Sequence, residues 1–387
     1  MTQIDSTGAS NKRRVCHLTL SHTPFDVRVF EKECRTLAAA GYDVHLAVPN
    51  ARESEVRDGV TMHDIPTSHG ANPIARWKAR LQQTYAVARR IDADIYHLHD
   101  PELIPAGLKL ARLGARIIYD AHEDAPLEAW SLNRGRPLHR IVLTTLWWGL
   151  LQQAKRRFDF FVCATPQIAR RFPQARSVEV RNYPRLEMFP VSASQRPRGR
   201  DLVFAGLVSE TRGAIEMLDA LAAVRSPGIR LKLFGTIATG TLRRRMEEHP
   251  AWSRVDYVGH RPWREVLDEY GRALGGLLLY ESTPEQLHCM PVKLFEFLLG
   301  GVPVIASDIP FWRDLLDGNP AVIFVNIKDP AAIAAAIERI AVDPQLAAGM
   351  GQAGQGHARA RFNWDAEGAK LVEVYAQVLS RAQKFKP

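Results

Sequence analysis

This 387-residue sequence has few cysteines and no long apolar run. It also has fewer acidic than basic residues. Its four cysteines are too few and too scattered for a disulfide framework or a Cys-x-x-Cys metal site, which fits a reducing compartment. The most apolar stretch, Ile141 to Leu151, has about half of the ~20 residues that a membrane-crossing helix needs. The apolar run from Val15 to Leu20 is too short for a signal peptide. We therefore expect a cytoplasmic protein that does not span a membrane.

The formal charge of +9 lies mainly in the first half, where residues 1–190 hold 27 Lys and Arg against 20 Asp and Glu. The segment from Arg134 to Arg185 has eleven basic and two acidic residues. Such a patch suits nucleic acid, an anionic membrane face or a phosphorylated substrate. The sequence shows no recognisable nucleic-acid module, and its aromatic residues are not interleaved with the basic ones as a base-stacking surface requires. We expect no nucleic acid partner.

Length and periodicity predict two α/β domains, each a doubly wound, Rossmann-like parallel sheet. Helical patterns, including Val27–Ala40 and Leu138–Arg157, separate the strands. The expected strands are Val15–Leu20, Val44–Val48, Ile95–His97, Arg116–Tyr119, Phe160–Cys163, Val178–Val180, Asp201–Ala205, Arg230–Phe234, Val255–Val258, Gly276–Tyr280, Val302–Ala306 and Val322–Val325.

Three prolines and a Ser-Ala-Ser run interrupt both periodicities between Pro184 and Arg200. We therefore expect a first domain over residues 1–184, a linker over 185–200 and a second domain over 201–363. Ligands of doubly wound folds bind at the carboxyl ends of the strands, so we expect a cleft there.

A Gly-x-Gly-x-x-Gly pattern occurs at Gly349 to Gly354. In a dinucleotide site these glycines follow a strand and let backbone amides approach a pyrophosphate. Here the pattern follows a helical segment, and no such fingerprint follows Val15–Leu20. We therefore interpret it as a surface helix junction, which disfavours a nicotinamide-dependent dehydrogenase.

The segment from His288 to Ser307 is the most informative one. Its pattern is that of a loop, a helix, a glycine stop and a buried strand. Pro291 suits a first helical turn, but no Ser, Thr, Asp or Asn precedes it to cap the free backbone amides. Lys293 runs against the preference of that turn for acidic residues. Both features favour an anionic ligand such as a diphosphate.

The run from Pro291 to Ser307, with Lys293 and Glu296 inside it, resembles the donor-binding signature of glycosyltransferase family 4, whose members have the two-domain GT-B fold. The resemblance places the second glutamate of the family's Glu-x7-Glu motif on Glu296, as a ligand of the donor ribose. The first glutamate falls on His288, a departure from the motif. Phe204 to Gly213 resembles the segment that carries a basic pair for the diphosphate, with Arg212 present and Leu207 where many members have arginine. The resemblance predicts as donor-binding residues Gly206, Arg212, His288, Met290, Pro291, Val292, Lys293 and Glu296.

Three further segments resemble acceptor-domain motifs of a polysaccharide-building branch: His97 to Pro105, Tyr119 to Asp124 and Arg181 to Pro184. On this resemblance His122 faces the donor sugar. The last segment, residues 364–387, resembles the helix that crosses back to the first domain. The expected acceptor-side residues are His22, Asp26, Arg28, His99, Asp100, Glu123 and Asp124. An alternative for His99 and Asp100 is that they only cap the helix that follows.

The resemblance implies transfer of a sugar from a nucleoside diphosphate sugar to a glycan or lipid-linked acceptor, with retention of anomeric configuration, in cell-surface polysaccharide biosynthesis. Fixed cations and helix amides can stabilise the leaving diphosphate, so we expect no cofactor and no metal. The expected catalytic residues are His122, Glu296, Arg212 and Lys293. Two alternatives remain at this stage: a nucleotide-sugar 2-epimerase, and a non-catalytic nucleotide-sugar-binding partner protein.

The segment 138–157 combines apolar residues, including Trp147 and Trp148, with basic residues at both ends. It predicts a helix that lies on an anionic membrane at the inner face, which suits a lipid-linked acceptor. The alternative is a core helix with solvated ends.

Overall fold

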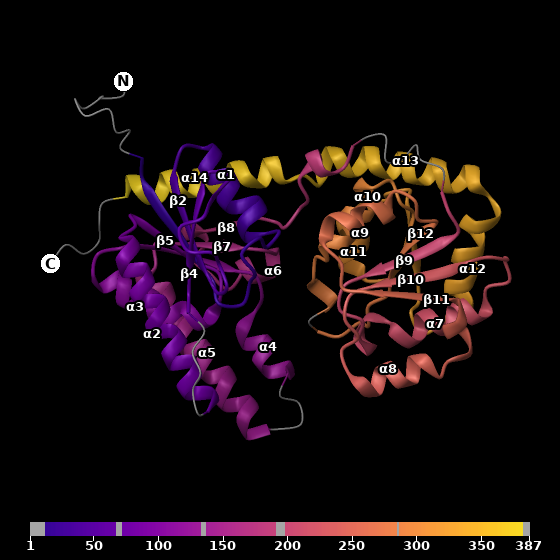
Figure 1. Cartoon of the computed structure of the whole chain (residues 1–387), viewed down its shortest axis with the longest axis horizontal. Coiled ribbons are helices and arrows are strands. Elements are labelled where there is room, and N and C mark those ends of the chain that lie inside the picture. Colours follow the sequence, from indigo (N-terminus) through magenta and orange to yellow (C-terminus); the bar gives the residue numbers. More distant parts are fainter. Residues whose placement is uncertain (1–11, 67–71, 133–136, 191–197, 285, 382–387) are drawn as a thin grey trace. The chain divides into compact units, whose positions relative to one another are not determined.

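The computed structural model describes residues 12–66, 72–132, 137–190, 198–284 and 286–381, and divides the chain into two compact units (Figure 1). Unit 1 comprises residues 1–182 and 365–387, and unit 2 comprises residues 183–364. Both are α/β units built on a parallel sheet, as the sequence predicts. Residues 191–197 of the expected linker lie outside the described residues.

Unit 1 has, among its described residues, an eight-stranded sheet of order β3-β4-β2-β1-β5-β6-β7-β8. The β3 strand pairs antiparallel with β4, and the other described pairs are parallel. The strands are β1 (Arg14–Leu18), β2 (Asp43–Val48), β3 (Val56–Arg57), β4 (Val60–Asp64), β5 (Ile95–Leu98), β6 (Arg116–Ala121), β7 (Phe160–Cys163) and β8 (Ser177–Glu179).

Side chains alternate between the two faces of this sheet because a strand has a period of two. Leu18, Leu98 and Phe161 face an apolar layer. Between them, His17 and His97 face the opposite side, where Tyr375 of the last helix contacts both. The helical elements are η1 (Val29–Cys34), α1 (Arg35–Ala39), α2 (Pro73–Ile91), α3 (Ile104–Arg112), α4 (Ala125–Leu132), α5 (Pro137–Arg157), α6 (Pro166–Ala169) and α14 (Trp364–Ser380).

Unit 2 has, in its described part, a six-stranded sheet of order β11-β10-β9-β12-β13-β14, with parallel pairing. All six of its strands match expected strands within two residues at either end. They are β9 (Asp201–Ala205), β10 (Arg230–Phe234), β11 (Val255–Gly259), β12 (Gly275–Leu278), β13 (Val304–Ser307) and β14 (Val322–Val325).

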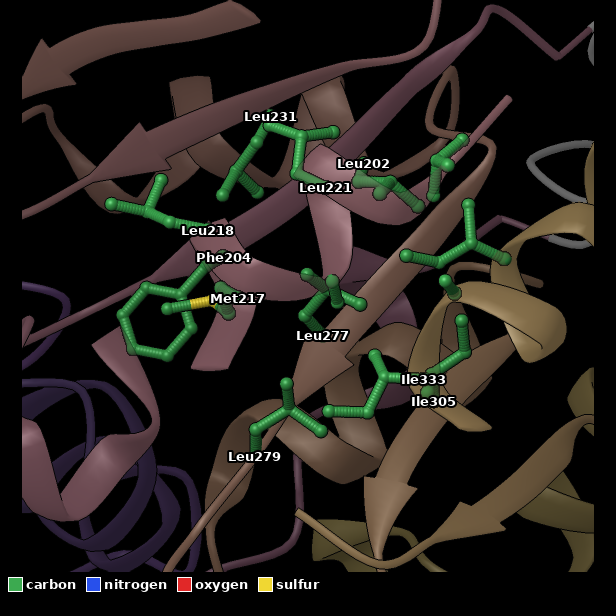
Figure 2. Packing of buried hydrophobic residues seen from close by; sticks show 14 of the residues in the cluster. Leu202, Phe204, Met217, Leu218, Leu221, Leu231, Leu277, Leu279, Ile305 and Ile333 are labelled. Carbon is green, nitrogen blue, oxygen red and sulfur yellow. The ribbon is translucent and has the colours of Figure 1, made fainter. Parts of the chain in front are cut away.

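Apolar layers cover both faces of this second sheet. Leu202, Phe204 and Leu277 pack with Met217 and Ile333 of the flanking helices on one face (Figure 2). The alternate residues Val203 and Leu278 lie in the layer of the other face. The helices are α7 (Ala214–Ala223), α8 (Gly240–Glu247), α9 (Trp263–Tyr270), α10 (Val292–Leu299), α11 (Pro310–Leu316), α12 (Pro330–Val342) and α13 (Pro344–Arg361).

The expected helix over Val27–Ala40 is wrong in type over its first part. Residues 29–34 form a π-helical segment, η1, in which the Glu33 amide donates to the Arg28 carbonyl five residues back. The Asp26 side chain accepts from the amides of Arg28 and Val29 at 2.8 and 2.9 Å and holds the start of this segment. The wider turn is typical of functional sites. The β3–β4 hairpin and α4 are further elements that the periodicity does not reveal.

The Gly349 to Gly354 pattern lies inside α13 rather than at a surface junction, which corrects that interpretation. A Cβ on Gly351 would lie 1.9 Å from the Gly301 carbonyl oxygen, and one on Gly354 would lie 2.2 Å from the Ala321 Cβ. These glycines therefore allow close packing of a buried helix face. They follow α12 rather than a strand, so the argument against a dinucleotide site holds.

Candidate active site

In each sheet the strand order reverses at the first strand, which is β1 in unit 1 and β9 in unit 2. Several predicted site residues directly follow the strands at these two reversal points. In unit 2 the order runs outward from β9 to β10 on one side and to β12 on the other; in unit 1, β1 has β2 and β5 as its neighbours. Loops at the carboxyl ends of strands at such a switch point form the ligand crevice of doubly wound sheets. Gly206 follows β9, His22 follows β1, and His99 follows β5.

Gly206 lets a lysine side chain approach the backbone after β9. Its φ of +121° is unfavourable for residues with a side chain. A Cβ at this position would lie 2.2 Å from Nζ of Lys293 and 3.8 Å from a terminal nitrogen of Arg212. Lys293 therefore meets two residues, Gly206 and Arg212, that precede it by more than 80 positions.

Arg212 and Lys293 are two cations without a carboxylate partner in the described part of the chain. The Arg212 guanidinium lies over the Tyr280 ring at 5.5 Å and donates a long 3.5 Å bond to the Leu207 carbonyl. Burial, reinforced by the charge of Arg212, lowers the pKa of Lys293 to about 8. Two crowded, partly desolvated cations attract an anion of high charge density.

The N-terminus of α10 opens beside Lys293. Pro291 is its N-cap residue, and no side chain caps the first amides. These amides and the helix dipole add to the positive potential of the two side chains. The helix begins without a cap because the sequence there is Cys-Met-Pro, which offers no short polar side chain.

Glu296 lies one turn further along α10 and is buried, with one carboxylate oxygen accepting a 2.8 Å bond from the Trp263 indole N–H. A buried carboxylate is costly unless polar groups satisfy it, and this one is fixed in position by the indole. The other donor-side residues lie in the adjoining loop. His288 is exposed at the end of η8 (Gln286–His288) with its ring 6.1 Å from that of Phe311, and Met290, Pro291 and Val292 are half-buried.

In unit 1, Thr19 organises the loop after β1. Its hydroxyl lies 2.7 Å from Nδ1 of His22 and donates to Asp100 at 2.9 Å. Asp100 also accepts from the Leu20 amide and is buried. This favours a positioning role for Asp100, and the structure shows no side-chain cap on the helix after it.

Arg28 points into the unit. Its guanidinium bonds to both oxygens of Asp120, at 2.9 Å to one and 3.0 Å to the other, and lies 3.0 Å from Glu33. Burial alone would raise the pKa of Asp120, but Arg28 and His122 hold it well below the ordinary value. Burial and the nearby Asp120 charge raise the pKa of Glu33. Arg28 therefore neutralises buried carboxyl groups, whereas Asp26 bonds to the backbone of η1.

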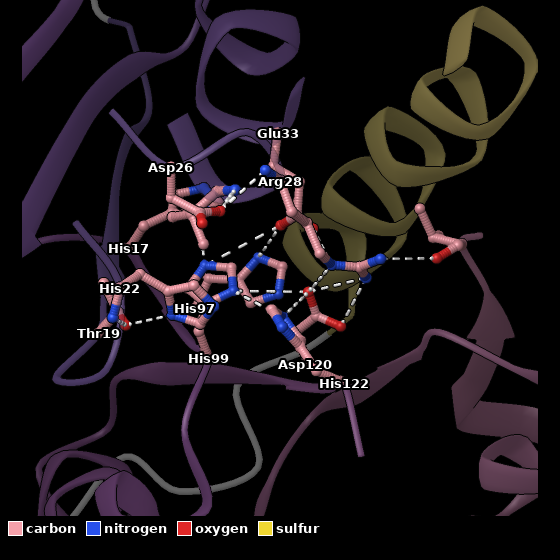
Figure 3. Close-up of polar contacts among 12 residues, drawn as sticks. His17, Thr19, His22, Asp26, Arg28, Glu33, His97, His99, Asp120 and His122 are labelled. Carbon is pink, nitrogen blue, oxygen red and sulfur yellow. Dashed lines mark hydrogen bonds and ion pairs between the residues drawn. The ribbon is translucent and has the colours of Figure 1, made fainter. Parts of the chain in front are cut away.

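His122 is half-buried directly after β6, and Nε2 of its ring lies 2.9 Å from Asp120 Oδ2 and 3.3 Å from His99 Nδ1. Its ring also contacts that of His22 edge to face at 5.2 Å. His99 itself is buried, and burial lowers its pKa to about 4. Four of the predicted residues, His22, Arg28, His99 and His122, thus belong to one cluster (Figure 3).

Glu123 and Asp124 lie at the start of α4. Asp124 pairs with Arg171 and accepts from the Leu127 amide. Glu123 is exposed next to Glu128, whose pKa burial and Glu123 raise to about 8. Glu128 is a carboxyl group beside the predicted acceptor residues that the sequence did not single out.

Two overlapping groups have the spacing of a divalent-cation site: His17, Glu33, His97 and His99, and Glu33, His99, Asp120 and His122. In each group one potential ligand atom per residue lies within 4.8 Å of the others. Both ring nitrogens of His17 and of His99 already have polar partners within the cluster. A cation would have to replace those bonds, so we describe the cluster as a hydrogen-bonded network.

The sequence did not single out Asp120, Glu33 or Trp263, although each contacts a predicted residue. It also did not single out Tyr375, which bonds to His17 and His97. A signal existed for Asp120, because an acidic residue inside an apolar strand is buried and needs a partner. No local signal could reveal Tyr375, which lies 278 positions from His97.

The sequence matches two family models: Glycosyltransferase Family 4 over residues 27–181, and glycosyl transferase-like over residues 212–373. It is similar to phosphatidyl-myo-inositol mannosyltransferase of Mycobacterium leprae, with 24% identity over 326 residues, 79% of this chain and 81% of that protein. The enzyme of the same name from Mycolicibacterium smegmatis is 22% identical over 369 residues, 88% of this chain and 87% of that protein.

Solved structures share the fold over nearly the whole chain. Sucrose-phosphate synthase of Thermosynechococcus elongatus superposes with a TM-score of 0.75 at 18% identity, covering 96% of this chain and 100% of that one. Anabaena Alr3699/HepE, in complex with UDP and glucose, superposes with a TM-score of 0.70 at 13% identity, covering 94% and 100%. These likenesses show the GT-B fold.

Proposed function

We propose that this chain, whose residues 27–181 match the model of glycosyltransferase family 4, transfers a sugar from a nucleoside diphosphate sugar, with retention of configuration, to a glycan or lipid-linked acceptor in cell-surface polysaccharide biosynthesis. One observation carries the donor assignment: Lys293 and Arg212 converge on Gly206 without a carboxylate partner among the described residues.

The diphosphate is the group that this cationic point fits. Negative charge grows on the diphosphate as the bond to the sugar breaks, and preorganised donors stabilise that charge most where water is excluded. Lys293, Arg212 and the free amides of α10 supply such donors at fixed positions. This chemistry needs no metal, so the proposal includes none.

Glu296 suits the ribose. Hydroxyl groups donate hydrogen bonds, and a carboxylate held by the Trp263 indole presents acceptors at a fixed position one turn from the diphosphate site. Unit 1 supplies the acceptor side and His122 in this proposal. Anabaena HepE, a structural neighbour, is described with bound UDP and glucose, which supports a nucleotide-sugar donor.

The two alternatives receive less support. The relatives and neighbours named above are transferases and synthases, which favours transfer over epimerisation. The alternative of a non-catalytic role was suggested by Leu207 and His288, the two positions that depart from the family motifs. Leu207 is exposed, and its carbonyl is the group that contacts Arg212, so the missing arginine leaves Lys293 and Arg212 as the diphosphate ligands.

A membrane-bound acceptor is favoured by α5. Leu138 is 80% exposed and Val142 63% exposed, and Ile141, Leu146 and Trp148 are also exposed. This exposure does not fit the alternative of a core helix. Lys155, Arg156 and Arg157 lie in the last turn of α5 and suit anionic headgroups. No helix in the described ranges is long and apolar enough to cross a bilayer, so the proposal is contact with one leaflet.

A binding and turnover experiment tests the proposed function. Thermal unfolding with UDP-, GDP-, ADP- and CMP-sugars and the free diphosphates identifies the nucleotide, since a ligand of the folded state raises Tm. The protein is then incubated with that donor and a lipid extract, and NMR determines the anomeric configuration of the product. We expect one nucleotide series to raise Tm and Lys293→Gln to abolish the shift. Arg243→Gln, on exposed α8 and paired with Glu247, is the matched control. A free epimeric sugar nucleotide made without acceptor would contradict the proposal.

A further inference from the structure

Unit 1 buries a row of polar side chains on the sheet face that α14 covers. His17, His97, His99 and Asp120 come from β1, β5 and β6 and the residue after β5, and all are buried. The strand register pairs His17 with His97, so their rings lie side by side with centroids 4.8 Å apart. Figure 3 shows these side chains pointing toward one another. A buried polar row of this kind needs a hydrogen-bond partner for each group.

Hydrogen bonds link His97 in series to His99, and an ion-pair contact continues the chain from His99 to Asp120. Nδ1 of His97 lies 2.8 Å from the Tyr375 hydroxyl, which lies 3.1 Å from Nε2 of His17. Nδ1 of His17 lies 2.8 Å from Nε2 of His99. Nδ1 of His99 lies 3.5 Å from Asp120 Oδ2 and 3.3 Å from Nε2 of His122, which itself lies 2.9 Å from the same Oδ2, so both ring nitrogens face one carboxylate oxygen. Three histidine rings and one tyrosine hydroxyl are thus linked in series to one carboxylate.

The protonation states of the chain follow from burial. Burial lowers the pKa values of His17 and His97 well below the ordinary value, with neighbouring histidines adding to the effect, and it lowers that of His99 to about 4. Each ring is therefore neutral near pH 7 and carries one proton. Asp120, held ionised by Arg28, only accepts hydrogen bonds.

The direction of the chain follows from its ends. If all protons point toward Asp120, every N–H and O–H has an acceptor, and the one unfilled group is Nε2 of His97, which is buried without a partner in the described residues. If they point the other way, Nε2 of His97 carries a buried proton with no acceptor. Orphaned buried N–H groups are rarer than orphaned acceptors and costly.

The Asp120 carboxylate also determines which ring nitrogen of His122 carries the proton. Its Nε2 lies 2.9 Å from Asp120 Oδ2, and a carboxylate can only accept, so Nε2 carries the proton. When His122 is neutral, its other nitrogen, Nδ1, is then an acceptor, and no described residue bonds to it.

We infer that Asp120 is a positioning residue that fixes His122 as the Nε2–H tautomer. Nδ1 of His122 then accepts a hydrogen bond from a substrate hydroxyl. The chain Tyr375–His17–His99 supplies the Asp120 carboxylate with a buried donor, the Nδ1–H group of His99. The assignment deepens the proposed function and rests on it for the identity of the hydroxyl, a sugar or acceptor O–H. The tautomers themselves are independent of turnover. The residue that begins the series, Tyr375, comes from the last helix of the chain.

Long-range 1H–15N NMR of the full chain labelled with 15N-histidine tests the inference, because protonated and unprotonated ring nitrogens have distinct shifts. Single substitutions to glutamine assign the rings. We expect Nδ1–H for His17, His97 and His99 and Nε2–H for His122. An Nδ1–H tautomer at His122, or an Nε2–H tautomer at His99, would overturn it. These spectra need no donor sugar, so a failure of the proposed function is distinguished from a failure of the inference.

Two variants distinguish a positioning role of Asp120 and its hydrogen-bonded chain from a purely structural role. Tyr375→Phe removes one hydroxyl, and we expect mixed tautomers at His17 and His99 with His122 unchanged; unchanged spectra at His17 and His99 would contradict the chain. Asp120→Asn, whose amide can donate, should give mixed tautomers at His122 and lower kcat about 100-fold with a smaller change in donor KM. If Asp120→Asn does not fold, Tyr375→Phe and the unsubstituted protein still decide the question. The His45–His63 pair, bonded at 2.8 Å near the sheet edge, is the internal reference that neither variant should change.

Discussion

Nζ of Lys293 lies 2.2 Å from the point where a Cβ on Gly206 would stand, so the lysine occupies the space that this glycine leaves open. Gly206→Ala should displace Lys293 and weaken nucleoside diphosphate binding by about tenfold or more in calorimetry. Gly259→Ala is the matched control, because Gly259 also has a positive φ but has open space around it. Equal losses in both variants would show that backbone strain alone accounts for the effect.

Diphosphate binding should take up a proton through Lys293. In the folded protein its pKa is lowered to about 8, and a bound diphosphate raises it again by pairing with the ammonium. At pH 8 binding should therefore take up about half a proton, and affinity should fall as the pH rises through 8. Calorimetry in buffers of different ionisation enthalpy measures the uptake. Lys293→Met should abolish it, whereas Lys232→Met, which removes an ion-paired lysine elsewhere in unit 2, should leave it unchanged.

The same pKa has a consequence for stability. A lysine whose pKa is lower in the folded than in the unfolded state favours unfolding while it is charged. Without ligand, its contribution to the free energy of unfolding should therefore rise between pH 8 and the ordinary lysine range, and saturating diphosphate should suppress that rise. Urea unfolding of the protein and of Lys293→Met across this range measures the difference.

Glu296→Ala should weaken donor binding by about tenfold or more, because the ribose loses a fixed carboxylate. Glu265→Ala, at an exposed position of α9, serves as the control for a lost negative charge. The free diphosphate without the nucleoside should bind the variant as it binds the unsubstituted protein. Unchanged affinity for the whole nucleotide in calorimetry would rule out the ribose assignment.

Glycosyl transfer should survive a metal chelator, since the proposal assigns the diphosphate to side chains and helix amides. The measurement is the initial rate after dialysis against EDTA, with and without added Mg²⁺ or Mn²⁺. A rate lost on chelation and restored by one of these ions would show that a cation completes the site.

Binding of α5 to lipid should depend on charge and on its exposed apolar face. We expect co-sedimentation with anionic vesicles that falls as salt rises, because the Debye length shortens from about 10 Å at 0.1 M to about 3 Å at 1 M. Val142→Glu should reduce binding to these vesicles, and Val342→Glu, at an exposed valine that ends α12 in unit 2, should not. Absence of the unsubstituted protein from the vesicle pellet at low salt would refute this contact.

The sheets were predictable because their strands are short apolar runs between helical patterns. The donor side was also predictable, since Pro291, Lys293 and Glu296 lie within six positions of one another. The contact of Lys293 with Gly206 was not, because it joins α10 to the loop after β9, 87 positions away, through a backbone conformation that the sequence does not state. The π-helical segment η1 was not predicted either, nor was the inward turn of Arg28, the residue before it, to a carboxylate 92 positions away.

The buried polar row in unit 1 is a second feature that the sequence alone does not predict. His97 and His99 alternate along a strand and its end, and a period of two places both on one face whatever that face meets. Whether the face is wet, or is covered by an element from the far end of the chain, is decided by the docking of α14. Motif matching therefore marked His99 and His122 and passed over Asp120, the residue that joins them.

Because α14 completes unit 1, that unit is assembled from the two ends of the chain, whereas residues 183–364 form unit 2 without interruption. During translation the polar row of β1 and β5 emerges long before Tyr375, so His17 and His97 lack this hydrogen-bond partner until then. Unit 1 can therefore reach its final packing only once α14, which is synthesised after all of unit 2, has left the ribosome. A nonsense mutation before Tyr375 therefore affects the part of the protein that was synthesised first.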